Sequence, residues 1–422
     1  MLNLKELKKA YSGKKVLITG HNGFKGSYIC LLLKFLGAKV YGYSLESVKG
    51  ELYNIFTEEV KKCKGAHKIL NEEHYVKSKN PTSEVEKRVE ELFDNFILTD
   101  NIFNGKLIDG EVVGDIRDYK RLKNFVNKIK PDYILHMAAQ PLVIRGYDEP
   151  RYTYEVNVMG TTNLLDAIRE TYKNTKKLVS ILNVTTDKVY ENNDKKDCAF
   201  IESDKLCGRD PYANSKSCSE LVTYAYEKSF FYDKSKFRIS TARAGNVIGG
   251  GDLNANRIIP DCYRAIKCKK NMEVRNPNSI RPYQFVLEPL ILYLNIMAYQ
   301  MKDKKYEGNY NIGPDKKDCL NTKALTEKFY AAWDDYENYE VKNSYNIKKG
   351  FMPKVIYDKP KKSAVHEASF LRLDNKKVKK VFNYKEIFKI DVTMWNTALI
   401  YYKMLHKTYL IADIIKMIEK VY

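Results

Sequence analysis

Residues 14–46, KKVLITGHNGFKGSYICLLLKFLGAKVYGYSLE, constrain the fold of this chain more than any other stretch. A short apolar run at residues 16–19 leads into a turn with three glycines. A continuous apolar segment and a second short run at residues 39–43 follow. Two short apolar runs separated by a segment of helical length are typical of a strand, a helix and a parallel strand. The sequence therefore predicts a βαβ unit near its start.

Gly20, Gly23 and Gly26 form the pattern GxxGxxG between the predicted strand and the predicted helix. An ordinary tight turn needs one glycine. Three glycines allow a sharp turn and bring backbone N–H groups close to a pyrophosphate at the start of the helix. The pattern predicts a dinucleotide-binding turn, and we expect Asn22 and Phe24 within it to contact the cofactor.

The residues after the second predicted strand favour NAD. Glu46 lies about 20 residues beyond Gly26, where a carboxylate can accept hydrogen bonds from an adenosine ribose. Lys49 keeps NADP open, because its amine is suited to pair with a 2'-phosphate. Asp115 and Ile116, in VGDIRD, are expected to flank the adenine, with a helix N-cap as the alternative for Asp115.

The rest of the first half continues the same pattern. Apolar runs at residues 132–139 and 177–184 alternate with helical patterns at 119–129 and 158–172. This alternation predicts an α/β fold with a doubly wound Rossmann parallel sheet. It fades after about residue 245, where helices are expected near 321–333 and 390–406. We expect an NAD-binding Rossmann domain over 1–244. Residues 245–422 should form mainly a smaller C-terminal α/β lobe for substrate, with some strands and helices returning to the first domain.

Residues 47–110 interrupt the alternation with a segment rich in Lys and Glu that includes the helix-like TSEVEKRVEELFDNFI. The segment is longer than an ordinary loop. A small helical excursion and a partly mobile insertion both remain open, and the sequence assigns it no role.

Composition and charge limit the class of protein. The 422 residues are 44% hydrophobic, enough to bury a large core. The net charge of +20 comes mainly from Lys spread along the chain, which favours a solvated surface over a nucleic-acid partner. No run of about 18 apolar residues occurs and the N-terminus is charged, so we expect a cytoplasmic protein without a membrane partner. The eight cysteines contain no CxxC pair, which argues against a metal site and against disulfides.

Two polar clusters supply candidate catalytic groups. In DPYANSKSCSELV, residues 210–222, Tyr212 and Lys216 are spaced to share one face of a helix, where the ammonium would favour the phenolate. Tyr212 would then act as a base, while Lys216 also holds the nicotinamide ribose. In NVTTDKVYEN, residues 183–192, Thr186, Asp187 and Lys188 directly follow an apolar run. Alone, these three residues are most simply a solvated end of a strand.

The motifs TGHNGFKGS, HMAAQPLV, NVMGTTNLLDA, NVTTDKVYEN, DPYANSK, RAGNVIGGGD, RNPNSIRP, VLEPL, NIGP and HEASFLRLD occur in this order over most of residues 12–46 and 112–400. With them the chain resembles the extended short-chain dehydrogenase/reductase superfamily and, within it, the CDP-glucose 4,6-dehydratase family. This resemblance implies conversion of CDP-glucose to CDP-4-keto-6-deoxyglucose by C4 oxidation, loss of water across C5 and C6, and return of hydride to C6. It also implies a homo-oligomer, either a dimer or a tetramer.

The resemblance also implies roles for the clustered residues. Thr186 would bind the sugar O4 and Tyr212 would take the proton of the C4 hydroxyl. Lys188 would remove the C5 proton and Asp187 would donate to the departing C6 hydroxyl, although which of the two performs each transfer stays open. Further cofactor contacts are expected from Ala138, Ala139 and Gln140. The nucleotide sugar is expected to meet Asn246, Arg257, Arg281 and Gln284.

Two departures keep the substrate open. Residues 283–285 read Tyr-Gln-Phe where the family usually shows Trp-Gln-His, and Ile144 followed by Arg145 stands where it usually shows Arg. A GDP-linked hexose or heptose therefore remains an alternative substrate. A 4-epimerase or 4-dehydrogenase, which needs no acid–base pair after the threonine, and a catalytically inactive nucleotide-binding protein are the alternative functions.

Overall fold

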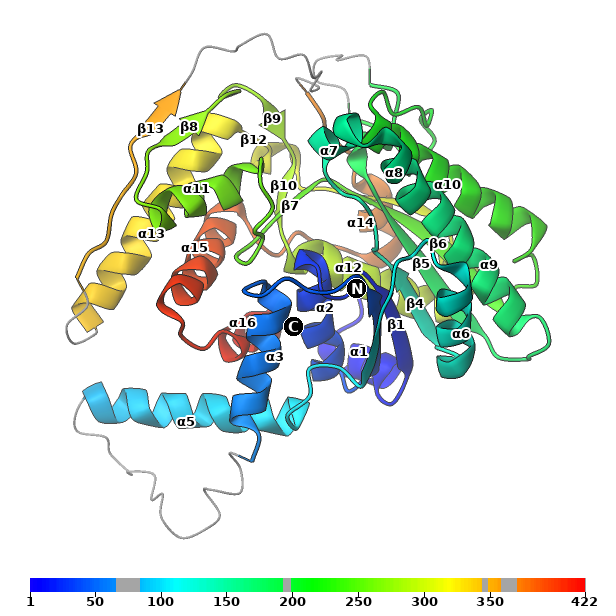
Figure 1. Cartoon of the computed structure of the whole chain (residues 1–422), viewed down its shortest axis with the longest axis horizontal. Coiled ribbons are helices and arrows are strands. Elements are labelled where there is room, and N and C mark those ends of the chain that lie inside the picture. Colours follow the sequence, from blue (N-terminus) through cyan, green and yellow to red (C-terminus); the bar gives the residue numbers. More distant parts are fainter. Residues whose placement is uncertain (66–83, 193–198, 344–347, 358–369, 422) are drawn as a thin grey trace.

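The computed structural model describes residues 1–65, 84–192, 199–343, 348–357 and 370–421. Its centre is a seven-stranded parallel sheet with the order β11-β6-β5-β4-β1-β2-β3 (Figure 1). The strands are β1 (Lys15–Thr19), β2 (Lys39–Ser44), β3 (Gly110–Val113), β4 (Tyr133–His136), β5 (Val179–Thr186), β6 (Phe237–Ala244) and β11 (Asn309–Ile312). The predicted doubly wound Rossmann sheet is confirmed.

β1 lies between β2 and β4, with Val16 in register with both Val40 and Tyr133. The chain therefore leaves β1 toward β2 and later returns to the other side of β1. In such sheets, ligands bind beyond the carboxyl ends of the strands at this switch point. The topology thus places a binding site at the carboxyl ends of β1, β4 and β5.

Helices cover both faces of the sheet, and β1 shows why. Val16 and Ile18 join one buried apolar cluster, and Leu17, which points to the opposite face, joins another. The first cluster is covered by α1 (Leu4–Tyr11), α2 (Phe24–Phe35) and α12 (Leu287–Lys302). The second is covered by α6 (Tyr119–Ile129), α9 (Gly160–Tyr172) and α10 (Pro211–Ser229). Burial on both faces explains why the central strands are continuously apolar.

The second half of the chain builds a smaller lobe with its own apolar core around Phe329, Trp333 and Tyr401. The expected helices near 321–333 and 390–406 are present, and the first extends further than expected. Elements α12 and β11 belong to this half but pack on the large sheet, where β11 pairs with β6. The lobe contains β7 (Asn246–Ile248), α11 (Ile258–Lys267), β8 (Met272–Val274), β9 (Ile280–Arg281), β10 (Tyr283–Phe285), β12 (Leu320–Asn321), α13 (Thr322–Asn343), β13 (Val355–Tyr357) and α15 (Ile390–His406).

The insertion contributes two helices, α3 (Leu52–Cys63) and α5 (Glu84–Phe103), while residues 66–83 lie outside the described residues. Figure 1 shows α5 crossing the end of α3. The buried carboxylate of Glu59 accepts hydrogen bonds from the backbone N–H groups of Leu410 (3.0 Å) and Ile411 (2.9 Å). Glu59 therefore fastens the insertion to the start of the C-terminal helix α16 (Ile411–Glu419).

The remaining elements are α7 (Val143–Asp148), α8 (Pro150–Tyr154), the π-helix η1 (Glu155–Met159), the 3-10 helices η2 (Asp187–Val189), η3 (Lys304–Tyr306) and η4 (Lys316–Asp318), and α14 (Lys376–Phe382). Within the described ranges, no helix combines the length and the apolar character that crossing a membrane requires. The first residues of the motif HEASFLRLD, 366–369, lie outside the part of the chain that the structure describes.

Candidate active site

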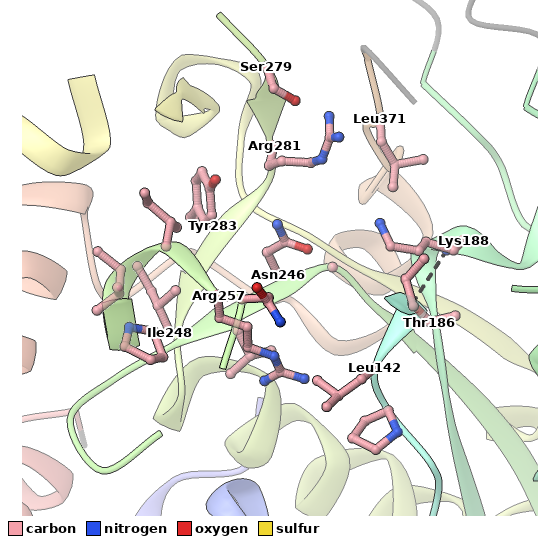
Figure 2. Close-up of a pocket in the computed structure, with 18 of the residues that line it drawn as sticks. Leu142, Thr186, Lys188, Asn246, Ile248, Arg257, Ser279, Arg281, Tyr283 and Leu371 are labelled. Atoms are coloured by element: carbon pink, nitrogen blue, oxygen red, sulfur yellow. Dashed lines mark hydrogen bonds between the residues drawn. The ribbon is translucent and has the colours of Figure 1, made fainter. Parts of the chain in front are cut away.

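A cavity of about 400 Å³ opens between the carboxyl ends of the sheet strands and the smaller lobe. Figure 2 shows Thr186 and Lys188 on one side, with the lysine pointing toward the centre. Asn246, Arg257 and Arg281 lie across from them, all from the second half of the chain. We call the first side the catalytic wall. Thr186 from β5, Lys188 from η2 and Tyr212 from α10 line the cavity there, and Asp187 is buried directly behind them. The side with Asn246, Arg257 and Arg281 is the lobe wall.

The glycine turn beside this cavity has the geometry of a diphosphate site. Gly20 has φ +75°, and a Cβ there would lie 2.9 Å from the backbone nitrogen of Ala138. At Gly26 a Cβ would lie 2.2 Å from the carbonyl oxygen of Gly20, so neither position tolerates a side chain. Gly23 precedes α2 and supplies no side-chain cap. The first N–H groups of α2 therefore suit an anionic oxygen, and the turn fits the diphosphate of a dinucleotide.

The structure brings only some of the residues expected at the adenosine together near the end of β2. Asn22 joins the glycine turn to the end of β2, because its Nδ2 donates to the carbonyl oxygen of Leu45 at 2.6 Å. Its Oδ1 accepts from the hydroxyl of Ser44 at 2.5 Å. Glu46 follows β2 and is exposed, as a ribose contact requires. Phe24, in the first turn of α2, lines the cavity.

After β3, Asp115 accepts a hydrogen bond from the guanidinium of Arg117 at 2.8 Å, which holds the pKa of Asp115 below its ordinary value despite partial burial. The alternative that Asp115 caps a helix is wrong, because the N-cap of α6 is Asp118. Ile116 is buried, and a Cβ at Gly160 would lie 2.5 Å from its Cγ2. Ile116 thus packs against the start of α9.

Beyond β4, Ala138 and Ala139 are half-buried next to the glycine turn, where the N–H of Ala138 donates to Thr19 Oγ1 at 3.2 Å. Gln140 is buried, and its Nε2 donates to the carbonyl oxygen of Leu142 and to Thr153 Oγ1. The side chain of Gln140 is therefore occupied in holding the loop after β4.

The Thr186–Asp187–Lys188 stretch is not a solvated end of a strand. Thr186 and Asp187 are only 6% and 1% exposed. Thr186 Oγ1 donates to Asp187 Oδ1 at 3.0 Å and accepts from the backbone N–H of Lys188 at 3.4 Å. Asp187 Oδ2 is buried without a hydrogen-bond partner in the described part of the chain. Lys188 is half-buried and lines the cavity, so the stretch presents a hydroxyl and an amine beside an unpartnered carboxylate oxygen.

Tyr212 and Lys216 lie on the first turns of α10, whose N-cap Asp210 accepts from the N–H of Ala213 at 2.9 Å. Both side chains are buried, and Lys216 Nζ donates to the carbonyl oxygen of Val184 at 3.0 Å. Burial raises the pKa of Tyr212 to about 12, although its hydrogen bond with Thr186 and the Arg257 cation lower it.

Burial lowers the pKa of the Lys216 ammonium to about 8, and the charge of Glu220 opposes this shift. The sequence predicted that the ammonium next to Tyr212 on the helix would favour its phenolate. In the structure, the hydrogen bond with Thr186 and the cation of Arg257 favour the phenolate instead. Both groups come from elements distant in sequence from α10.

The residues of the lobe wall are held by different contacts from those of the catalytic wall. Arg257 pairs with the buried Asp252 at 2.9 Å, and Arg281, at the end of β9, donates to the carbonyl oxygen of Ile280 at 2.9 Å. Asn246 begins β7 opposite Tyr283. Gln284 is buried next to Tyr283 but does not line the cavity, since neighbouring strand residues face opposite sides. The structure thus brings three of the four expected substrate residues together and separates Gln284 from them.

Many cavity residues were not predicted from the sequence, and two charged ones come from glycine-rich motifs. Lys25, in GFKGS, and Asp252, in GGGDL, both line the cavity. Lys25 follows Phe24 within the glycine motif. A cation in the first helical turn is a signal from which this residue could have been predicted. Asp252 carried no separate signal, because its role as the partner of Arg257 depends on the fold of the loop.

Comparisons with known proteins agree with this geometry. The family model described as GDP-mannose 4,6 dehydratase matches residues 68–396. A CDP-glucose 4,6-dehydratase of Salmonella typhimurium is 36% identical over 334 residues, which cover 78% of this chain and 79% of the relative. The glycine turn lies outside the range of the family model, so its interpretation depends on the geometry above.

Solved structures show the same fold. The dTDP-glucose 4,6-dehydratase of Bacillus anthracis in complex with NAD has a TM-score of 0.62 at 16% identity, covering 93% of this chain and 97% of that one. A UDP-glucose-4-epimerase of Stenotrophomonas maltophila with bound NAD and formylated UDP-arabinopyranose has a TM-score of 0.65 at 16% identity, covering 94% and 100%. The fold is thus one that solved nucleotide-sugar dehydratases and epimerases share. Within this class, the chain belongs to the GDP-mannose 4,6-dehydratase family.

Proposed function

We propose that this protein is a nucleotide-sugar 4,6-dehydratase that converts CDP-glucose to CDP-4-keto-6-deoxyglucose. The observation that carries the proposal is that Thr186, Lys188 and Tyr212 line one cavity, with Asp187 hydrogen-bonded to Thr186 directly behind them. A carboxyl group and an amine at this position supply the acid and the base that elimination of water requires. CDP-glucose is favoured because the relative with 36% identity carries that name.

The proposed cofactor is NAD, held by the glycine turn, by Glu46 at the ribose, and by Tyr212 and Lys216 near the nicotinamide. The narrow Gly20–Gly26 turn and the uncapped start of α2 support this placement. Two solved structures with this fold contain NAD by name. When bound, NAD supplies a hydride acceptor for C4 and a hydride donor for C6. Lys49 keeps NADP as the alternative.

The chain's own residues would move the protons. Thr186 anchors the sugar O4, and Tyr212 takes the proton of the C4 hydroxyl. Because burial raises the pKa of Tyr212 to about 12, the phenol must lose its own proton before it can act as this base. The resulting C4 ketone acidifies the C5 hydrogen, which Lys188 removes with its amine. Asp187 gives a proton to the C6 hydroxyl, which departs as water. Asp187 Oδ2 has no hydrogen-bond partner in the described part of the chain, but Asp187 is 1% exposed and does not line the cavity, so this role requires its side chain to turn toward the substrate.

The lobe wall would hold the substrate diphosphate through Asn246, Arg257 and Arg281, since guanidinium groups match phosphate oxygens. We accordingly propose that residues 245–422 mainly bind the nucleotide sugar, and that residues 1–244 bind the cofactor. Tyr283 also lines the cavity, at a position where the resembling family usually has Trp. A GDP-linked hexose or heptose therefore stays the alternative substrate.

The test is incubation of the purified enzyme with CDP-, GDP-, UDP- and dTDP-sugars, followed by mass spectrometry. The proposal expects CDP-glucose to lose one water without added reductant. A product of unchanged mass that co-elutes with the C4 epimer would identify an epimerase. Stoichiometric accumulation of NADH with an oxidised sugar would identify a dehydrogenase.

We further propose a homo-oligomer formed through the outer face of α9 and α10. Leu221 and Tyr224 on α10 are 54% and 60% exposed, and Met159, just before α9, is 52% exposed. Apolar side chains gathered on one face support a contact with a second copy. Sedimentation should show a dimer or tetramer that Leu221→Lys dissociates, whereas a monomeric wild-type protein would contradict this. The seven cysteines in the part of the chain that the structure describes are free thiols, which supports a reducing compartment such as the cytoplasm.

A further inference from the structure

Lys25 is a cation at the meeting point of the two proposed binding regions. It lies in the first turn of α2, directly after the glycine turn, and its side chain lines the same cavity as Thr186 and Arg257. No step of the proposed reaction uses this cation.

The Lys25 ammonium has no bonded partner of opposite charge in the described part of the chain. No hydrogen bond or ion pair joins its Nζ to another residue in the described part of the chain. Burial lowers the pKa of the Lys25 ammonium to about 8, and the cations of Arg257 and Lys216 lower it further. The carboxylates of Asp187 and Asp252 oppose this shift.

Neither nearby carboxylate bonds with Lys25, although Asp187 Oδ2 has no other partner in the described part of the chain. Asp187 accepts from Thr186, while Asp252 pairs with Arg257 and also accepts from Asn254 Nδ2 at 2.6 Å. A partly buried ammonium without a bonded anion is unfavourable. Its position in the first turn of a helix adds to this cost, because the helix dipole is positive there. A bound anion would relieve both costs at once.

We infer that Lys25 is a positioning residue that binds diphosphate oxygens when the ligands are present. The inference rests on the proposed function, which brings two diphosphates to this cavity. One belongs to the cofactor, against the start of α2, and the other to the nucleotide sugar, near Arg257. The ammonium lies where the two regions meet, and the binding experiment below distinguishes the two sources of the anion.

The experiment measures binding of CDP and of NAD separately by calorimetry, with the full chain. Lys25→Met removes the charge, Lys25→Arg keeps it, and Lys39→Met is the control, because Lys39 is an exposed lysine at the start of β2. We expect Lys25→Met to weaken one or both ligands by roughly 10- to 100-fold, the usual range for a charged hydrogen bond. Lys25→Arg should stay within about threefold of the wild type, as should the control.

A second readout detects the proton on Lys25. Near pH 8, diphosphate binding should draw a proton onto the amine, which appears as a dependence of the binding heat on the buffer. Lys25→Arg should bind well but take up less proton, because guanidinium does not titrate there. Lys216 is unchanged in this comparison, so its own titration cancels.

Each outcome decides the inference. Weaker CDP binding alone identifies the nucleotide-sugar diphosphate, and weaker NAD binding alone identifies the cofactor diphosphate. Unchanged affinity of both ligands in Lys25→Met, or equal proton uptake by Lys25→Arg and the wild type, overturns the inference. A wild type that binds CDP but does not dehydrate CDP-glucose refutes the proposed function and leaves the result for Lys25 readable.

Discussion

The two walls of the cavity differ in how their side chains are held. On the catalytic wall, Thr186, Asp187 and Tyr212 are buried and stand on a full-length strand, its 3-10 extension and a long helix. On the lobe wall, Arg257 is 35% exposed and Arg281 ends a two-residue strand. The first wall is therefore placed by the large sheet, whereas the second is placed by short segments. Under the proposed function, reaction type and substrate choice would therefore depend on separate parts of the molecule.

The largest effect should follow Tyr212→Phe, which removes the base of the first step from the catalytic wall. We expect kcat to fall by about 10³- to 10⁴-fold, at the upper end of losses for a general base. Affinity for CDP should stay near that of the wild type, because only the phenolic oxygen is lost. Turnover with CDP-glucose and calorimetry with CDP measure the two quantities. Tyr232→Phe, which changes an exposed tyrosine, is the control, and near-normal turnover of the Tyr212 variant would exclude it as the base.

Arg243→Met tests how firmly the catalytic wall is supported. Arg243 and Glu220 form a fully buried ion pair at 2.9 Å beneath the end of β5, where Glu220 also accepts from Thr185. Removing one partner leaves a buried charge unpaired and should lower the free energy of unfolding by about 3–5 kcal/mol. Urea denaturation measures this loss. A change below about 1 kcal/mol would show that the wall does not depend on this pair.

Lys188→Met should permit C4 oxidation but stall elimination, because the C5 proton loses its acceptor. We expect dehydration to slow by about 10²- to 10³-fold. Exchange of the C5 hydrogen with solvent deuterium measures the step directly, beside transient NADH absorbance. Exchange at the wild-type rate would assign Lys188 a structural role instead. Lys205→Met, at an exposed surface ion pair, is the matched control.

Glu59→Gln tests how the insertion, which lies outside both walls of the cavity, contributes to the stability of the protein. Burial raises the pKa of Glu59 from 4.5 to about 7, although N–H groups of Leu410 and Ile411 oppose this. Because the folded-state pKa is raised, stability is highest below about pH 4.5 and declines as the pH rises through about 7. The decline is about 3 kcal/mol at most, and Glu59→Gln should remove it.

Thermal unfolding of Glu59→Gln and the wild type between pH 5 and about 8 measures this difference. The neighbouring Glu58 is exposed, so Glu58→Gln should leave the pH dependence unchanged. Equal slopes for Glu59→Gln and the wild type would contradict the assignment. A large loss of activity without loss of stability would show that the insertion acts on the site.

The smallest effect is expected on the lobe wall. Arg281→Met should raise KM for CDP-glucose about tenfold and leave kcat almost unchanged, since the loss of one phosphate contact affects ground state and transition state alike. Arg151→Met, on an exposed arginine of α8, is the control. A fall in kcat with unchanged KM would place Arg281 in the chemistry and remove the difference between the two walls.

The sequence predicted most of the first half because its signals are local. Residues 119–129 were predicted as a helix with the bounds that the structure shows, since a helical pattern of apolar residues marks it. The βαβ unit and the Tyr212–Lys216 helix were likewise confirmed. These patterns are complete within a short stretch of chain, so tertiary contacts are not needed to read them.

What the sequence did not predict depends on contacts between distant segments. Gln140 was expected at the cofactor, but Thr153 and the loop after β4 occupy its side chain. Gln284 was grouped with the substrate residues, although it faces away from the cavity. The pKa of Tyr212 is raised by its burial and lowered by Thr186 and Arg257, and all three influences arise only in the folded molecule.

In the proposed reaction, one site oxidises C4, eliminates water and reduces C6. Conversion of CDP-glucose deuterated at C4, without added reductant, tests it most directly. The account predicts a product that has lost one water and carries the deuterium at C6, as NMR would show. Deuterium absent from C6 with NADH accumulating, or a C4 epimer of unchanged mass, would contradict the account.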